Sequence, residues 1–321
     1  MNILTLNLHL KDIETGGWKS LEKCNKYPGA RWMYYFCRLA EEAGFVIQGT
    51  ETVLNLLLGK SIDPKDVYLL QEGHNDNWDK LAELGVTKTV LFNFESPMYA
   101  PDFYDRLDEK ALPVFSKRFG FPNYDSAGPI FPSYDKEDII PFGSVPKQDR
   151  YVTILSNKNF QLMGRIGLAM KASKNFQWAI LCELHTERAK KMLWKIFKNE
   201  IDIYGQGWEY ADIWGIKDAY GKPIEPVANK LEVMSRYKYA LCYENVGREG
   251  YCTEKIIDAY LAGCEPVTNS IPYSVLFKLS HIFEFEVKRY QDWLYETEIK
   301  NPFSHKFMAS EVMKSFEGIS A

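Results

Sequence analysis

The chain has 321 residues, of which 46% are hydrophobic and 26% are charged, and it carries a formal net charge of −4 at pH 7. This composition is typical of a soluble globular protein, and the length is sufficient for two domains. The negative charge and the lack of a dense run of lysine and arginine argue against a general nucleic-acid binder.

Strand-like and helix-like segments alternate along the first third of the chain. Strands are predicted at residues 3–8, 45–48, 67–71 and 87–94. Helices are predicted at residues 30–43 and 77–84, followed by the helix-ending glycines Gly44 and Gly85. This alternation predicts an α/β domain with a mostly parallel sheet.

Glu95 follows directly after the fourth of these strands, in the sequence Glu-Ser-Pro. Ligands bind outside the carboxyl ends of the strands in open α/β sheets, so the position of Glu95 favours a functional role. The alternative is a structural carboxylate that caps a backbone N–H at the end of the strand.

Residues 113–149 are rich in proline, glycine and tyrosine, and this composition disfavours long regular elements. Long loops inside compact enzymes are commonly functional or connect domains. We therefore expect a first domain over residues 1–148 and a second over residues 149–321.

The second domain repeats the α/β alternation and ends in a helical tail. Strands are predicted at residues 150–157, 177–181 and 201–204, and helices at residues 162–172 and 185–199. The pattern predicts a second Rossmann-like domain.

Residues 238–263 read as strand, loop and helix. Tyr239 and Tyr243 follow the period of a strand, Thr253 is a candidate N-cap, and Gly263 stands where a C′ glycine ends a helix. A loop that feeds a helix N-terminus gathers free N–H groups and forms an anion site. Lys255 in the first turn is unfavourable for the helix dipole, which a bound phosphate would explain, and Glu254 could then bind sugar hydroxyls. An ordinary βα unit with solvated charges remains the alternative.

Several segments together resemble the α-1,3/4-fucosyltransferase family (glycosyltransferase family 10). Residues 237–245, 250–255 and 259–267 are similar to its donor-binding signature, which holds a GDP-sugar. Residues 92–97 resemble its Glu-Ser-Pro motif, and residues 151–158 resemble the strand that begins its donor domain. The first 85 residues match only in general layout, and the sequence departs from the family pattern from Thr268 onward.

The resemblance implies a GT-B type α/β fold, in which two Rossmann-like domains face each other across a cleft. Residues 1–148 would bind the acceptor and residues 149–321 the GDP-sugar. The implied reaction is an inverting transfer of fucose from GDP-L-fucose to an oligosaccharide acceptor, at the α-1,3 position of GlcNAc in a β-galactosyl-GlcNAc unit. Such a reaction belongs to glycan biosynthesis, for example protein or lipopolysaccharide glycosylation.

The resemblance also implies roles for individual residues. Glu95 would be the catalytic base, and the donor would be bound by Arg188, Asn245, Tyr251, Glu254 and Lys255. Arg188 lies thirteen residues before Ile201, which is the spacing of the family's donor-phosphate arginine, whereas the rival Arg165 lies too far away. Lys230 matches a lysine that precedes the signature in relatives, without an evident role.

No Asp-x-Asp pair ends a predicted strand, so we predict no metal ligands and no required cofactor, although Mg or Mn could stimulate the reaction. Two alternatives remain: a non-catalytic nucleotide-sugar or glycan-binding protein of the same fold, and a transferase that uses another GDP-sugar. A methyltransferase or dehydrogenase is disfavoured, because residues 3–30 contain no G-x-G-x-x-G motif.

The six cysteines form no CxxC pair and are interpreted as buried thiols: Cys24, Cys37, Cys182, Cys242, Cys252 and Cys264. No apolar run approaches the length of about 20 residues that a membrane span needs. We therefore expect a cytoplasmic protein, with peripheral membrane association as an option, or else an excised catalytic portion.

Replacing Arg188 or Lys255 with alanine is expected to weaken GDP binding by about 1–3 kcal/mol, because a charge-assisted hydrogen bond to phosphate is lost. Isothermal titration calorimetry with GDP measures this effect. Unchanged affinity in Arg188→Ala, together with a loss in Arg165→Ala, would transfer the phosphate role to Arg165.

Overall fold

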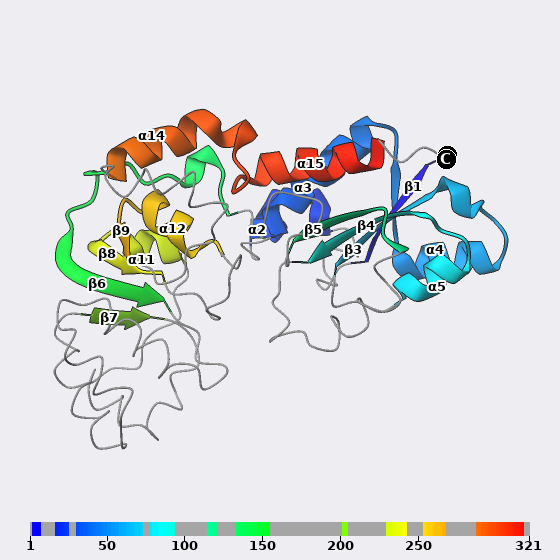
Figure 1. Ribbon diagram of the computed structural model, residues 1–321, viewed down its shortest axis with the longest axis horizontal. Coiled ribbons are helices and arrows are strands. Elements are labelled where there is room, and N and C mark those ends of the chain that lie inside the picture. Colours follow the sequence, from blue (N-terminus) through cyan, green and yellow to red (C-terminus); the bar gives the residue numbers. More distant parts are fainter. Residues whose placement is uncertain are drawn as a thin grey trace, which may run out of the picture. The chain divides into compact units, whose positions relative to one another are not determined.

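The computed structural model describes residues 2–7, 17–25, 30–72, 77–93, 114–120, 133–154, 201–204, 229–242, 253–267 and 287–317. The chain divides into unit 1, which comprises Met1–Asp135 and Thr297–Ala321, and unit 2, which comprises Lys136–Glu296. Each unit is built on a parallel sheet of its own (Figure 1). The expectation of two α/β halves is therefore confirmed.

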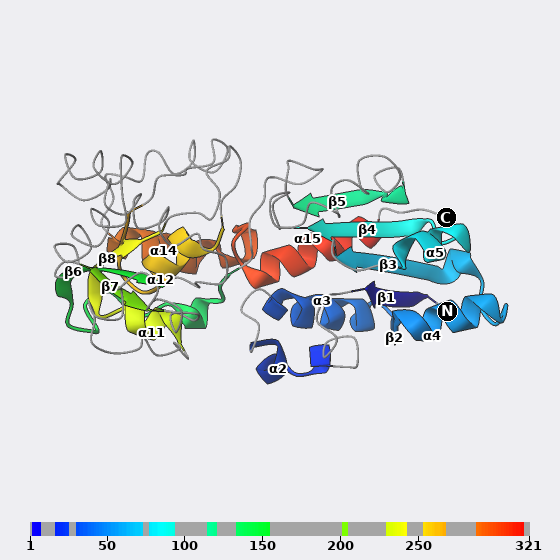
Figure 2. The ribbon, with the colours of Figure 1, turned by 90° about the horizontal axis from the view of Figure 1, so that it is seen from below.

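In the part of unit 1 that the structure describes, five strands form a parallel sheet in the order β2-β1-β3-β4-β5 (Figure 2). Its strands are β1 (Ile3–Asn7), β2 (Val46–Gly49), β3 (Val67–Glu72), β4 (Lys88–Asn93) and β5 (Lys117–Gly120). The strand order reverses between β1 and β3, and ligands of doubly wound sheets bind beside such a point, at the carboxyl ends of the strands.

Helices cover both faces of this sheet. The longer ones are α3 (Arg31–Glu42), α4 (Thr50–Leu58), α5 (Trp78–Glu83) and α15 (His305–Glu317). The short ones are η1 (Gly17–Lys19), α2 (Leu21–Asn25), η3 (Pro64–Asp66) and η8 (Glu298–Lys300). Because side chains alternate along a strand, Leu4 and Leu6 pack towards α3 and α15, while Ile3 packs towards α4 and α5. Burial on both faces explains the continuous apolar runs of these strands.

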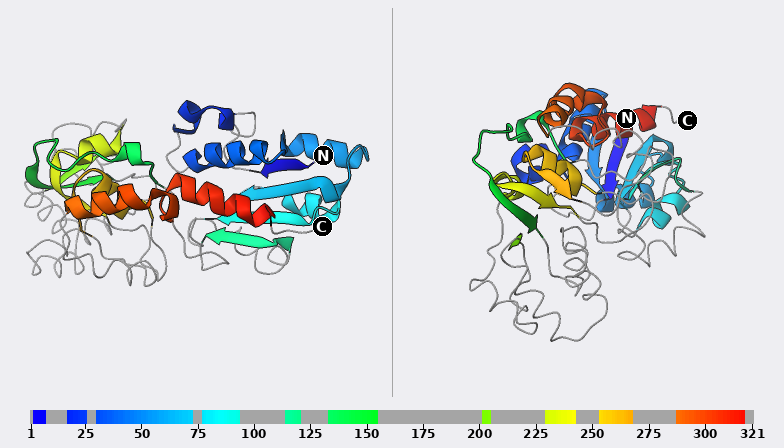
Figure 3. Two further views of the ribbon diagram at one scale, coloured as in Figure 1. Left: turned by 90° about the horizontal axis from the view of Figure 1, so that it is seen from above. Right: turned by 60° about the vertical axis from the view of Figure 1, so that its left-hand side comes forward.

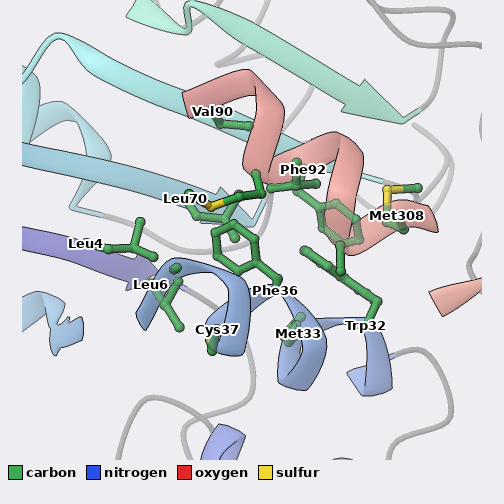
Figure 4. Close-up of a cluster of buried hydrophobic side chains, with 14 of the residues drawn as sticks. Leu4, Leu6, Trp32, Met33, Phe36, Cys37, Leu70, Val90, Phe92 and Met308 are labelled. Atoms are coloured by element: carbon green, nitrogen blue, oxygen red, sulfur yellow. The ribbon is translucent and has the colours of Figure 1, made fainter. Parts of the chain in front are cut away.

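The core between the sheet and α3 is rich in aromatic side chains. Trp32 of α3 is fully buried, and its ring centroid lies 4.5 Å from that of Phe92 on β4. Figure 4 shows Trp32 and Phe36 directed at the sheet, with Met308 of α15 beside them. The aromatic-rich helix predicted from the sequence therefore supplies the main core of unit 1.

The C-terminal helix belongs to unit 1, whereas we expected it in the second domain. It runs beside α3 (Figure 3), and Val312 and Phe316 lie in the same core cluster. The chain passes into unit 2 after Asp135, earlier than the expected boundary at residue 148. The pattern of α15 shows an apolar face, but local sequence does not specify which sheet covers that face.

The two segments where the chain crosses between units are paired with each other inside unit 1. Tyr134 forms a parallel bridge with Ser304, and the backbone N–H of His305 donates to the Tyr134 carbonyl at 3.1 Å. Asp135 accepts hydrogen bonds from Arg31 and Tyr35 of α3, each at 3.0 Å. The ends of unit 1 are thus fixed to its core.

The described residues of unit 2 form a four-stranded parallel sheet in the order β7-β6-β8-β9. Its elements are η6 (Lys136–Asp138), β6 (Gln148–Ile154), β7 (Ile201–Tyr204), α11 (Lys230–Met234), β8 (Tyr237–Leu241), α12 (Lys255–Leu261), β9 (Glu265–Val267) and α14 (Val287–Thr297). The predicted strand at residues 177–181 and helices at residues 162–172 and 185–199 lie outside the described residues.

The end of α12 follows the sequence expectation. Gly263 has a φ of +70°, and the backbone N–H of Cys264 donates to the Ala259 carbonyl at 2.8 Å, which forms a Schellman-type ending. Gln291 of α14 reaches this end, because its amide nitrogen donates to the Tyr260 carbonyl at 2.8 Å and its amide oxygen accepts from the Phe142 N–H at 2.9 Å. This one amide therefore joins α14, α12 and the chain before β6.

Lys147 was not expected to matter, yet its ammonium joins the ends of two helices. It donates to the carbonyls of Ser235 at 2.8 Å, Tyr237 at 3.3 Å and Ala262 at 3.2 Å. Ser235 and Ala262 are the C-caps of α11 and α12, where unpaired carbonyls favour a cation. Burial lowers the pKa of Lys147.

Lys147→Met is expected to destabilise the protein by about 1–3 kcal/mol, because the carbonyls lose a charged donor. Thermal unfolding followed by circular dichroism measures the change. Lys238→Met is the matched control, since Lys238 is 52% exposed and pairs with the exposed Asp149. Equal melting temperatures for the two variants would contradict the structural role of Lys147.

Candidate functional site

The structure describes two of the six predicted site residues. Glu254 and Lys255 lie next to each other at the start of α12. The other four lie outside the described residues: Glu95, Arg188, Asn245 and Tyr251. The rival Arg165 lies outside them as well. The roles of these five residues stay predictions.

The start of α12 differs by one residue from the sequence expectation. Glu254, rather than Thr253, occupies the N-cap position, and its side chain makes no capping hydrogen bond. The Thr253 hydroxyl instead accepts a hydrogen bond from the Lys255 ammonium at 2.7 Å. That contact places the lysine side chain back over the residue that precedes the helix.

Three charged side chains meet at the starts of α11 and α12. The ammonium of Lys230 forms an ion pair with Asp258 and lies 3.5 Å from a carboxylate oxygen of Glu254. Glu254 and Asp258 are four residues apart, so they share one face of the helix. We call Lys230, Glu254 and Asp258 the charged triad.

Burial and charge act in opposite directions within the triad. The Asp258 side chain is 5% exposed, whereas those of Lys230 and Glu254 are 30% and 32% exposed. Burial raises the pKa of Asp258 to about 6, although Lys230 opposes that shift. Burial would also raise the pKa of Glu254, but Lys230 and Lys255 lower it to about 2. Glu254 therefore stays ionised at neutral pH.

Lys230 stays protonated within the triad. Burial alone would lower its pKa, but the carboxylates of Asp258 and Glu254 raise it. Its backbone is also well defined, because the Asn229 side chain caps α11 by accepting from the N–H groups of Leu231 at 3.1 Å and Glu232 at 3.3 Å. A fixed positive charge thus stands beside the predicted donor-binding glutamate.

Asp258 was not among the residues predicted from the sequence. Its signal in the sequence is a lone acid within the apolar run Ile-Ile-Asp-Ala of a predicted helix, and such an acid needs a buried partner. Lys230 was noted only through the family resemblance. Its partner could not be named, because 28 positions separate Lys230 from Asp258 along the chain.

A second polar group crosses the sheet of unit 2. Arg150 on β6 holds the Asp202 carboxylate with two bonds, at 3.2 Å and 2.5 Å, and the Tyr237 hydroxyl donates to the same carboxylate at 2.9 Å. Asp202 lies on β7 and Tyr237 on β8. This group therefore links three neighbouring strands, and Arg150 is committed to it.

Polar side chains also gather at the carboxyl edge of the unit 1 sheet. Asn7 of β1 donates to the side-chain oxygen of Gln71 on β3 at 2.6 Å, and Gln71 donates to the backbone carbonyl of Glu72 at 2.6 Å. Both amides are buried, and they lie where the strand order reverses. Glu72 ends β3 as Glu95 follows β4, so it is a second carboxylate with a positional argument for function.

Other expectations concern metals, thiols and membranes. Among the described residues, no group of three or more His, Cys, Asp or Glu side chains could hold a metal ion. Four of the six cysteines are described, and these four are buried free thiols, as expected: Cys24, Cys37, Cys242 and Cys264. Within the described part of the chain, no helix has both the length and the apolar character to cross a bilayer.

Comparison with known proteins gives one short sequence match and several structural likenesses. The sequence matches no protein-family model. The α-(1,3)-fucosyltransferase FucT of Helicobacter pylori is 54% identical over 41 residues, which are 13% of this chain and 9% of that protein. The matched part thus spans less than a tenth of the relative.

Two of the similar solved structures belong to an α1,3-fucosyltransferase. The structure with GDP-fucose has 14% identity and a TM-score of 0.36, and the match covers 100% of this chain and 91% of that one. The structure with GDP has 13% identity, a TM-score of 0.40, and coverage of 99% and 91%. Spinosyn rhamnosyltransferase SpnG with thymidine diphosphate has 11% identity, a TM-score of 0.34, and coverage of 99% and 96%.

The pKa of Asp258 predicts a pH-dependent stability. The folded value is about 6, whereas an unfolded aspartate has a pKa of about 3.9. As the pH falls from 7 to 5, the folded state takes up a proton that the unfolded state does not, so the contribution of Asp258 to the free energy of unfolding rises.

Urea unfolding at pH 7 and pH 5 tests this expectation. The gain on acidification should be smaller in Asp258→Asn than in wild type, because the variant lacks the titrating carboxyl. Glu232→Gln, at a side chain that is 64% exposed, is the control. An equal pH effect in wild type and Asp258→Asn would show that Asp258 does not titrate in this range.

Proposed function

We propose that this protein is an inverting fucosyltransferase of the α-1,3/4 family, which transfers fucose from GDP-L-fucose to a hydroxyl of an oligosaccharide. The signature over residues 237–267 carries this proposal. Its strand and helix correspond to β8 and α12, and Glu254 and Lys255 stand at the start of that helix. The 41-residue match to an α-(1,3)-fucosyltransferase supports the same family.

Unit 2 is proposed to bind the donor. Negative charge develops on the leaving GDP, so cations aimed at the diphosphate stabilise the transition state more than the ground state. Lys255 and Arg188 are assigned this role, and Asn245 and Tyr251 are assigned to hold the diphosphate or the sugar. No metal ion is needed in this scheme, and Mg or Mn would at most stimulate it.

Glu254 is proposed to face the fucose ring. Glycosyl transfer passes through an oxocarbenium-like state, in which positive charge grows on the ring. A carboxylate that remains ionised stabilises this charge, and the low pKa of Glu254, about 2, keeps it ionised at any working pH.

Unit 1 is proposed to bind the acceptor, with the two units in a GT-B arrangement. Glu95 would take the proton from the attacking hydroxyl, and a single displacement inverts the configuration at the anomeric carbon. Its strand, β4, ends at Asn93, at the carboxyl edge that also carries Asn7 and Gln71. The proposed acceptor is the GlcNAc of a β-galactosyl-GlcNAc unit, with α-1,3 linkage.

Transfer assays decide between this function and its alternatives. The full chain is incubated with GDP-fucose or GDP-mannose and a panel of β-galactosyl-GlcNAc acceptors, and GDP release and product mass are measured. Fucosylated product is expected with GDP-fucose alone. Tight nucleotide-sugar binding without GDP release would indicate a binding protein, and product from GDP-mannose would change the donor.

Glu95→Gln is expected to lower the transfer rate by about 10²-fold or more, because glutamine keeps the size of the side chain but cannot accept the proton. GDP affinity should stay unchanged, since the proposed donor contacts lie in unit 2. Glu72→Gln tests the rival carboxylate at the neighbouring strand end. Full activity of Glu95→Gln combined with inactive Glu72→Gln would assign the base to Glu72.

A further inference from the structure

The charged triad has one more carboxylate than is needed to balance its single ammonium. Two carboxylates one turn apart face a single ammonium, and the closer of them, Asp258, is nearly fully buried. A buried carboxylate is tolerated only with a close counter-charge, so Asp258 fixes where the Lys230 ammonium lies. Glu254, at 3.5 Å and partly exposed, is the partner that is left open towards solvent.

The backbone around Lys230 adds to this precision. Lys230 is the first residue of α11, directly after the N-cap Asn229. Met234 of α11 packs in the same buried cluster as Ile256 and Ala259 of α12, so apolar contacts set the spacing of the two helices. The Lys230 side chain is therefore fixed at its backbone by α11 and at its ammonium by Asp258.

The charges of the triad sum to one net negative charge. Lys230 and Asp258 cancel each other, so Glu254 remains the net negative charge of the triad. Lys230 nevertheless stays close enough to lower the pKa of Glu254. The Lys230 ammonium, whose charge is balanced by Asp258, can therefore orient the Glu254 carboxylate without neutralising its charge.

We propose that Lys230, anchored by Asp258, is a positioning residue that holds the Glu254 carboxylate towards the sugar of the donor. This inference rests on the proposed function and adds two residues to it. Neither residue touches the donor in this scheme. Both act through Glu254, and the loss of either should matter only while Glu254 is present.

A double-mutant cycle tests this dependence. Lys230→Met, Glu254→Gln and the double variant are made in the full chain, and kcat and KM for GDP-fucose are measured with the melting temperature. Each single change is expected to lower kcat/KM by about tenfold or more, and the double variant should be no worse than Glu254→Gln. Effects that multiply in the double variant would overturn the inference, because Lys230 would then act independently of Glu254.

Further variants separate positioning from folding. Asp258→Asn should reduce kcat/KM as Lys230→Met does, whereas Lys230→Arg, which keeps the charge, should recover most of the activity. Lys230→Gln keeps hydrogen-bond donors towards Asp258 and provides a second cycle if Lys230→Met does not fold. Glu232→Gln removes the exposed pair with Arg236 on the same helix and should leave kcat/KM unchanged.

The outcomes distinguish this inference from the function it rests on. A wild-type protein that transfers fucose while Lys230→Met and Lys230→Gln match its kcat/KM would overturn the positioning role alone. A wild-type protein that releases no GDP from GDP-fucose with any acceptor would overturn the proposed function, and the positioning role with it.

Discussion

The ion pair between Lys230 and the buried Asp258 joins α11 to α12, beside the buried apolar cluster that the two helices share. A carboxylate in that position would be strongly destabilising without its counter-charge. At the opposite ends of the same two helices, Lys147 binds the carbonyls of both C-caps. A lysine at each end therefore joins the two helices, and Glu254 lies at the end where Lys230 and Asp258 form their ion pair.

In each of the two sheets, polar residues lie or follow in the sequence at the point where the strand order reverses. Among the described strands of each sheet, the first lies between two later ones, so the order reverses beside it. In unit 1 this point carries the Asn7–Gln71 amide pair. In unit 2 it lies between β6 and β8, and the sequence continues from these strands into Ser156-Asn157 and Glu244-Asn245. Neutral amides suit hydroxyl groups, and the Lys255 ammonium at the start of α12 suits a phosphate, which agrees with the proposed division between acceptor and donor.

Local patterns were sufficient to predict much of the fold. Alternating and continuous apolar runs located β1, β3 and β4, and the glycines after α3, α5 and α12 have the positive φ values that helix endings require. The short β5 was missed, because it lies in a stretch whose proline and glycine content predicted loop. The sheet that α15 covers could not be predicted, since an apolar helix face does not identify its partner.

The site was predictable only where its residues are neighbours in the sequence. Glu254 and Lys255 were predicted because they are adjacent in a recognisable signature, and their roles stay predictions. Asp258 was missed because its partner Lys230 lies 28 positions away on another element, and Lys147, at the other ends of the two helices, was missed for the same reason. Such contacts arise from tertiary packing, so they cannot be predicted from residue type or from spacing along the chain. Glu95 and Arg188 lie outside the described residues, so their roles rest on sequence motifs alone.

We propose that unit 2 binds a GDP-sugar at the start of α12. Amide hydrogen exchange of the full chain with and without GDP, read by mass spectrometry and with ADP as the control nucleotide, tests it most directly. Slower exchange is expected at residues 253–258 with GDP, and little change is expected with ADP. Slower exchange confined to the carboxyl edge of β1 and β3, or equal protection by the two nucleotides, would contradict it.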